Sequence, residues 1–82
     1  MPARAPIPPE QLKRMLEVDN WRLVAEDEYN WVLDRADSKE PIIIPRKGEL
    51  IALDVLMSII GRVGWNNAIY DNLKQRCPAH LH

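Results

Sequence analysis

Three consecutive isoleucines, Ile42–Ile44, lie between Pro41 and Pro45. β-Branched side chains favour strands, so the run predicts a strand. Proline has no N–H to donate to a neighbouring strand, and a proline at each end therefore limits how long this strand can be. The chain is expected to contain a very short strand at residues 42–44, and other segments must supply the rest of its sheet.

Two segments before this run alternate large apolar residues with other residues, as strands with one buried face do. They are Trp21–Ala25 and Tyr29–Leu33, and the acidic run Glu26–Glu28 between them predicts a hairpin turn. In the second segment the aromatic residues Tyr29 and Trp31 share one face, which is expected to pack into the core. The three strands together predict an antiparallel meander.

Apolar residues with helical spacing precede and follow the predicted sheet. The first such stretch predicts a helix over Glu10–Val18, with Pro9 in its first turn, where the missing N–H costs little. The second begins at Asp54, a suitable N-cap, and ends at Gly64, a typical helix stop. Both helices carry a polar face opposite the apolar one, as helices that pack on a sheet do.

A last helix is expected after Trp65. Either Asn66 or Asn67 is its predicted cap, and the helix ends near Arg76. Its apolar stripe consists of Ile69, Tyr70 and Leu73. The predicted fold is therefore α+β, with the order helix, three strands, helix and a short final helix, and a three-stranded antiparallel sheet packed on the helices.

The chain has 82 residues, which is the size of one small domain. Prolines are dense in residues 1–8, so this segment is predicted to be a flexible N-terminal arm. The folded domain is expected at residues 9–76 and a C-terminal tail at residues 77–82. Large aromatic side chains dominate small cores, so the three tryptophans are expected to be buried. These are Trp21, Trp31 and Trp65.

The formal net charge of −1 lacks the basic excess of a strong nucleic-acid-binding protein. Cys77 is the only cysteine, so no internal disulfide can form, which fits a reducing, cytoplasmic location. No apolar run has the length of a membrane span, and the first ten residues lack the apolar core of a signal peptide. A cytoplasmic protein without a cofactor is expected.

Three segments resemble the HicA (YcfA-like) toxin family in their order and spacing. The stretch Asp19–Val24 is similar to the family's Gly-Trp-x-Leu-Val strand, with Asn20 in place of the glycine. Ile43–Gly48 is similar to its third strand and the proline that follows it. Leu53–Trp65 is similar to its second helix, including the serine-isoleucine pair and the closing glycine. The resemblance covers about residues 10 to 76.

The resemblance implies a fold related to double-stranded-RNA-binding domains. It also implies a toxin that cleaves messenger RNA and is neutralised by an antitoxin of the HicB type. The family's motif is Gly-Ser/Thr-His on the second strand, where the histidine is catalytic. The matching residues here are Glu28, Tyr29 and Asn30, so all three motif residues are absent. The basic residue usually found just upstream is replaced by Glu26-Asp27.

Two features of this region argue against RNA cleavage. A metal-free site needs a group that titrates near neutral pH, whereas the side chain of Asn30 can only form hydrogen bonds. Residues 26–40 include six acidic and two basic side chains, a local charge of −4, where binding of RNA phosphates requires the opposite sign. Any catalytic residue is therefore unassigned, and enzyme activity is not expected.

The remaining candidates for RNA binding are Asn30, Arg46, Lys47 and Arg62, and each has a simpler interpretation. Asn30 is more often an exposed strand residue, and basic residues are more often part of a mixed solvated surface. Val24 and Val32 are candidates for binding a partner, because they are expected on the open side of the sheet.

Cys77, His80 and His82 have metal-ligand chemistry, but three ligands in a tail are fewer than the four of a structural zinc site. A metal site is therefore not expected, and a disordered end is the simpler interpretation.

Three functions remain open. The first is a non-catalytic HicA-like domain that binds a protein, either an antitoxin-like partner or a second copy of itself. The second is a messenger-RNA endoribonuclease toxin with a rearranged site. The third is an RNA-binding module without catalysis. The absent histidine, the acidic meander and the near-neutral net charge favour the first.

Overall fold

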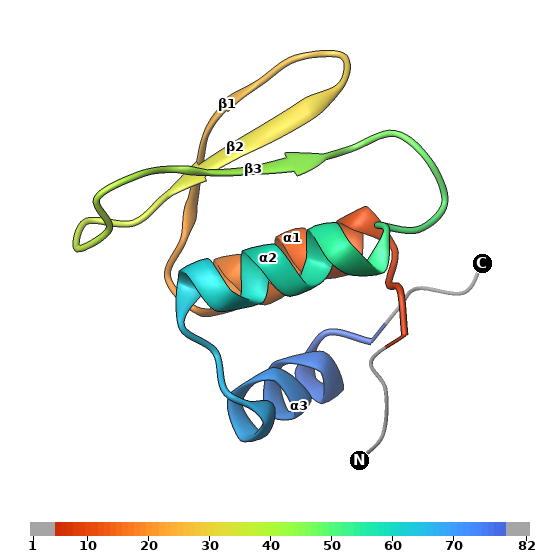
Figure 1. The fold of residues 1–82 in the computed structure, drawn as a ribbon. Helices are drawn as coiled ribbons and strands as arrows, with labels where there is room; N and C mark the ends of the chain where they lie inside the picture. Colours follow the sequence, from red (N-terminus) through yellow and green to blue (C-terminus); the bar gives the residue numbers. More distant parts are fainter. Residues whose placement is uncertain (1–4, 79–82) are drawn as a thin grey trace.

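The computed structural model describes residues 5–78 and confirms an α+β domain with three helices and a three-stranded antiparallel sheet. The strands are paired in the order β1-β2-β3, and the helices lie on one side of the sheet (Figure 1). Along the chain the elements are α1 (Pro9–Val18), β1 (Arg22–Glu26), β2 (Asn30–Asp34), β3 (Ile42–Pro45), α2 (Leu53–Val63) and α3 (Asn67–Arg76).

Local signals place most helix ends where they are expected. Pro9 is the first residue of α1, Gly64 ends α2 with a positive φ of 79°, and the side chain of Asn66 caps α3 by accepting from the N–H of Ile69. The prediction for Asp54 is wrong, because Ala52 is the N-cap of α2. Asp54 lies in the first turn, where its carboxylate accepts from the N–H of Val55 at 2.9 Å.

The register of β2 and β3 decides which side of the sheet is apolar and buried. Trp31 pairs with Ile44 and Leu33 with Ile42, and all four side chains are buried against the helices. The alternate pair, Val32 and Ile43, lies on the opposite face. That face is covered by no other element among residues 5–78 and is called here the open face.

The prediction that Tyr29 packs into the core is wrong, because its side chain is 62% exposed. β2 begins one residue later, at Asn30, and Tyr29 belongs to the connection between β1 and β2. The Asp27 carboxylate accepts from the N–H of Tyr29 and holds it in this turn. Side chains in the turn extend beyond the area that the helices cover, so strand alternation does not predict their burial.

The first strand also differs from its sequence pattern. Trp21 is buried but precedes β1, which begins at Arg22, and all five residues of β1 are exposed. The pairing with β2 shifts between Leu23 and Ala25, so a β-bulge interrupts the strand at Val24. A bulge bends its strand and increases the twist, which breaks the simple alternation of faces. β1 is therefore an exposed edge strand.

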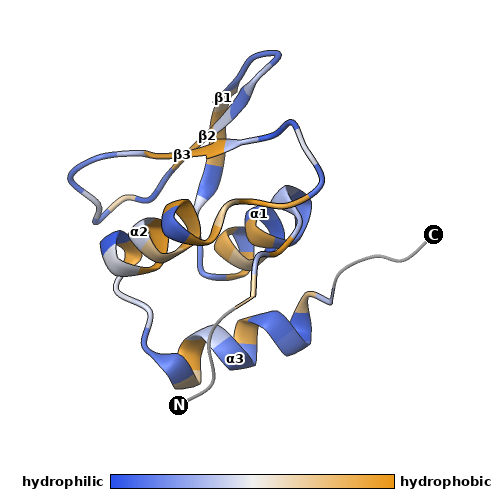
Figure 2. Cartoon of the chain, turned by 45° about the vertical axis from the view of Figure 1, so that its right-hand side comes forward, coloured by the Kyte–Doolittle hydropathy of each residue, from blue (hydrophilic) through white to orange (hydrophobic). Residues whose placement is uncertain are grey.

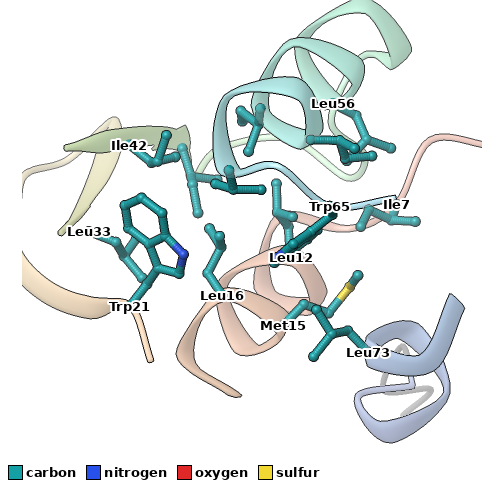
Figure 3. Close-up of a cluster of buried hydrophobic side chains, with 14 of the residues drawn as sticks. Ile7, Leu12, Met15, Leu16, Trp21, Leu33, Ile42, Leu56, Trp65 and Leu73 are labelled. Atoms are coloured by element: carbon teal, nitrogen blue, oxygen red, sulfur yellow. The ribbon is translucent and has the colours of Figure 1, made fainter. Parts of the chain in front are cut away.

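One apolar core joins the sheet to the helices (Figure 3). Trp21, Trp31 and Trp65 are buried in it, as expected. It also includes two residues that the sequence assigns to the arm and the tail, Ile7 and Cys77. The carbonyl of Ile7 accepts from the N–H of Ile51 at 2.8 Å, so the packed domain extends beyond the predicted range of residues 9–76.

Both ends of the described chain are therefore attached to the domain. The carbonyl of Cys77 accepts a buried hydrogen bond from Nε2 of Gln11 at 2.9 Å.

Ile69 is exposed, so the buried stripe of α3 consists of Tyr70 and Leu73 alone. None of the helices in residues 5–78 has both the length and the apolar character needed to cross a membrane.

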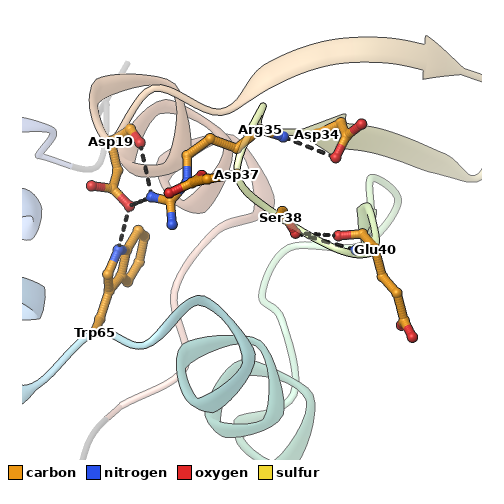
Figure 4. Close-up of polar contacts among 7 residues, drawn as sticks. All are labelled: Asp19, Asp34, Arg35, Asp37, Ser38, Glu40 and Trp65. Carbon is orange, nitrogen blue, oxygen red and sulfur yellow. Dashed lines mark hydrogen bonds and ion pairs between the residues drawn. The ribbon is translucent and has the colours of Figure 1, made fainter.

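Asp19 connects three segments that are distant in the sequence (Figure 4). It follows α1, and its Oδ2 accepts from Nη1 of Arg35, after β2, and from Nε1 of Trp65, after α2, both at 2.9 Å. The guanidinium carbon of Arg35 also lies 4.9 Å from the ring centroid of Trp21. We call these contacts the Asp19 junction. It fixes the sheet relative to α1 and α2.

Candidate functional site

Asn30, the first residue of β2, lies at the end of the β1–β2 hairpin. Asn30 is half-buried, and its backbone N–H donates to the Asp27 carboxylate at 2.8 Å. The Asp27 N–H donates to the Asn30 carbonyl at 3.0 Å. Across the sheet, Asn30 pairs with Pro45. The hairpin thus holds Asn30 in place through its backbone, while its side chain supplies no group that can exchange a proton.

Arg46, a candidate for RNA binding, is engaged within the protein. Its Nη1 donates to the carbonyl of Asp27 at 2.9 Å and lies 3.4 Å from a carboxylate oxygen of Glu26. Its guanidinium carbon lies 5.4 Å from the ring centroid of Trp31. These contacts join the residue after β3 to the β1–β2 hairpin. Arg46 therefore has a structural role, and its charge is compensated by Glu26.

The other two basic candidates also have acidic partners. Nζ of Lys47 lies 3.9 Å from a carboxylate oxygen of Glu28, and Nη2 of Arg62 lies 2.6 Å from one of Glu40. Glu40 precedes β3, whereas Arg46 and Lys47 follow it. The structure therefore brings Asn30 together with Arg46 and Lys47 but places Arg62 at the opposite end of β3. The three basic candidates form three ion pairs, two beyond one end of β3 and one near the other, and do not make one basic face.

The open face of the sheet has an apolar centre. Val24 and Ile43 are 59% and 56% exposed, and Val32 is half-buried between them. Ala25, Val32 and Ile43 are aligned across the three strands by the register. Figure 2 shows apolar colouring on β2 and β3 where the two strands lie next to each other. We call Val24, Ala25, Val32 and Ile43 the apolar strip; it includes both residues that the sequence predicts for partner binding.

Sequence analysis did not identify a groove that lies between β3 and α2. It has a volume of about 320 Å³ and is open to solvent. It is lined by Ile42, Ile43, Asp54, Val55, Ser58, Ile59 and Arg62, and we call it the edge groove. Its residues are separated by up to twenty positions in the sequence, so only the packing of α2 beside β3 brings them together. The exposed Ser58 and the half-buried Val55 on one flank of α2 are the only local signal.

The residues suggested as weak metal ligands do not form a described site. Cys77 is buried in the core instead of lying in a free tail, and His80 and His82 lie outside the described residues. Within residues 5–78, no three histidine, cysteine or acidic side chains are grouped so that they can hold a metal ion.

Comparisons of the chain with protein-family models, curated proteins and solved structures find no significant match.

Proposed function

We propose that this chain is a HicA-like domain that acts by binding a protein partner and does not cleave RNA. The apolar strip on the open face of the sheet is the observation that carries the proposal. Exposed apolar side chains that are contiguous on a small domain are typical of surfaces that bind other proteins. Val24 and Ile43 are more than half exposed on a face with no cover among residues 5–78.

The charges around the strip support a protein partner over RNA. Arg46, Lys47 and Arg62 each lie within 4 Å of a carboxylate. RNA binding depends on basic side chains that neutralise phosphates and so release their condensed counterions into solution. Basic side chains that are already paired with carboxylates contribute little to this. Asn30 occupies the position that the family resemblance assigns to the catalytic histidine, and it cannot act as an acid or a base.

Partner binding is tested with the full chain and the product of the adjacent gene, because the resembling toxins are paired with antitoxins. Sedimentation of the mixture is expected to show a complex. Val24→Asp or Ile43→Asp should weaken this complex by about tenfold or more, because each places a charge in an apolar contact, at a cost above ~1.4 kcal/mol.

Leu50→Asp is the matched control, since Leu50 is also 56% exposed but lies outside the strip. It should leave the complex unchanged. If the chain neither binds this partner nor associates with itself, or if the strip variants bind as well as the control, the proposal is wrong. A dimer of the chain alone that is disrupted by Ile43→Asp identifies a second copy as the partner.

Ribonuclease activity and RNA binding are expected to be absent. Induced expression of the chain should neither arrest growth nor degrade messenger RNA, and the purified chain should not bind single- or double-stranded RNA at low salt. Arrest that Asn30→Ala abolishes would instead establish a rearranged toxin. Salt-dependent RNA binding that Arg46→Glu with Lys47→Glu weakens would establish the RNA-binding alternative.

A further inference from the structure

The outer edge of β3 exposes one residue's backbone for pairing. The N–H of Arg46 donates to the carbonyl of Tyr29, at 2.9 Å, so Arg46 faces β2. In an antiparallel pair the N–H and carbonyl groups of successive residues point alternately toward the partner strand and away from it. The N–H and carbonyl groups of Ile44 and Ile42 therefore also point toward β2. The N–H and carbonyl of Ile43 therefore point to the outer edge, where no strand pairs with β3 in residues 5–78.

The edge groove lies along this exposed backbone. Its apolar floor consists of Ile42 and Ile59, which are buried, and Val55, which is half-buried. Ile43 also lines the groove and belongs to the apolar strip as well. An extended segment whose backbone pairs with Ile43 would point alternate side chains toward this floor. The arrangement thus offers two backbone hydrogen bonds and an apolar contact to the same segment.

The charges in the groove are not balanced. Arg62 is paired with Glu40, at 2.6 Å, and so adds no free positive charge. The Asp54 carboxylate forms no ion pair among the described residues, and its one hydrogen bond is with the adjacent N–H of Val55. Asp54 lies in the first turn of α2 and is exposed. The groove therefore complements a segment that carries a basic side chain.

We propose that the edge groove binds an extended peptide segment of the partner, with an apolar side chain on the groove floor and a lysine or arginine beside Asp54. This inference deepens the proposed function and rests on it. β3 is four residues long, or about 13 Å, so the groove accommodates a segment of similar length. Pro45 has no N–H, so Ile43 is the only residue of β3 that offers both an outward donor and an outward acceptor, and side chains provide most of the selectivity.

The test uses the full chain labelled with ¹⁵N and two short acetylated, amidated peptides. One peptide contains a leucine and a lysine two residues apart, and the other has glutamate in place of the lysine. Millimolar lysine peptide is expected to shift the amide signals of Ile43, Val55 and Ser58. The glutamate peptide should bind about two- to fivefold more weakly, which is the range expected of an exposed charge pair.

Two pairs of variants assign the binding to the groove. Asp54→Asn should weaken binding of the lysine peptide by about two- to fivefold, whereas Asp71→Asn, on α3, should not change it. Ser58→Arg should block the groove, whereas Met57→Arg should not, because Met57 is exposed on the same helix but does not line the groove. All four positions are exposed, so the variants should fold.

Shifts that map elsewhere, equal binding of the two peptides, or no shifts at millimolar peptide would overturn the inference. Concentration-dependent shifts of Ile43 and Ser58 without peptide would show that a second copy occupies the groove, which would also overturn it. The proposed function is tested separately, since Val24→Asp changes the strip without changing the groove. A partner complex that is sensitive to Val24→Asp but not to Ser58→Arg would retain the function and refute only the peptide site.

Discussion

Ile44→Ala is expected to lower the free energy of unfolding by about 2–5 kcal/mol, the range for truncating a buried isoleucine. Ile44 is fully buried, and it pairs with Trp31 on the face of the sheet that packs against the helices. Small domains are marginally stable, so this loss is a large part of the total stability. Urea denaturation followed by tryptophan fluorescence measures it.

Ile43→Ala is the matched control, because it removes the same atoms from the adjacent residue of the same strand. Ile43 is 56% exposed, so its truncation is expected to cost less than about 1 kcal/mol. A shift of one residue in the pairing of β3 would exchange the two faces of the strand. If Ile43→Ala costs as much as Ile44→Ala, the register described here, and with it the apolar strip, is wrong.

Asp19→Ala is expected to lower the free energy of unfolding by about 1–3 kcal/mol, because it removes the only acceptor among residues 5–78 for the indole N–H of the buried Trp65. It also removes the partner of Arg35 in a partly buried ion pair at 2.9 Å. Thermal and urea unfolding measure the loss. Asp19→Asn retains an oxygen that can accept from Trp65, so it should recover part of the stability.

Asp37→Ala provides the control for the Asp19 junction, because Asp37 also pairs with Arg35, at 2.7 Å. Its side chain is 75% exposed, and exposed ion pairs contribute only ~0–1 kcal/mol. A loss for Asp37→Ala equal to that for Asp19→Ala would mean that Arg35 is held mainly by its exposed partner. The junction would then not be what fixes the sheet relative to the helices.

Elements with strong local signals were predictable from the sequence. The isoleucine run predicts β3, Gly64 provides the left-handed residue that ends α2, and Asn66 has the side chain that caps α3. Each signal acts within a few residues, so it does not depend on the rest of the fold. Asp54 was a wrong prediction for the N-cap, because the helix begins two residues earlier, at the N-cap Ala52, and the Asp54 carboxylate accepts from the adjacent N–H of Val55.

Burial at the ends of the domain depends on distant contacts and was not predictable in this way. Ile7 is buried because its segment pairs with Ile51, and Cys77 because Gln11 reaches its carbonyl across the fold. Proline density and closeness to a terminus say nothing about such contacts. Tyr29 shows the opposite error, since alternation continued past the end of the strand into an exposed turn.

The candidate site was predictable only in part, because it too depends on contacts between residues that are distant in the sequence. Val24 and Val32 were expected on the open face, and Val24 is indeed exposed there. The acidic partners of Arg46 and Arg62 are about twenty residues away in the sequence, so the neutralised charges follow only from the tertiary structure. The edge groove likewise requires β3 and α2 to be adjacent.

The two outer strands differ in how they limit unwanted association between molecules. Open sheet edges are templates on which identical chains can add strand by strand and aggregate. The bulge at Val24 twists β1, so that its edge is not flat. Pro45 has no N–H, so the N–H of Ile43 has no second outward donor beside it on β3. Both features disfavour the addition of identical strands in a continuous ladder. The apolar strip is therefore exposed on a sheet whose two edges are both poor templates for fibre growth.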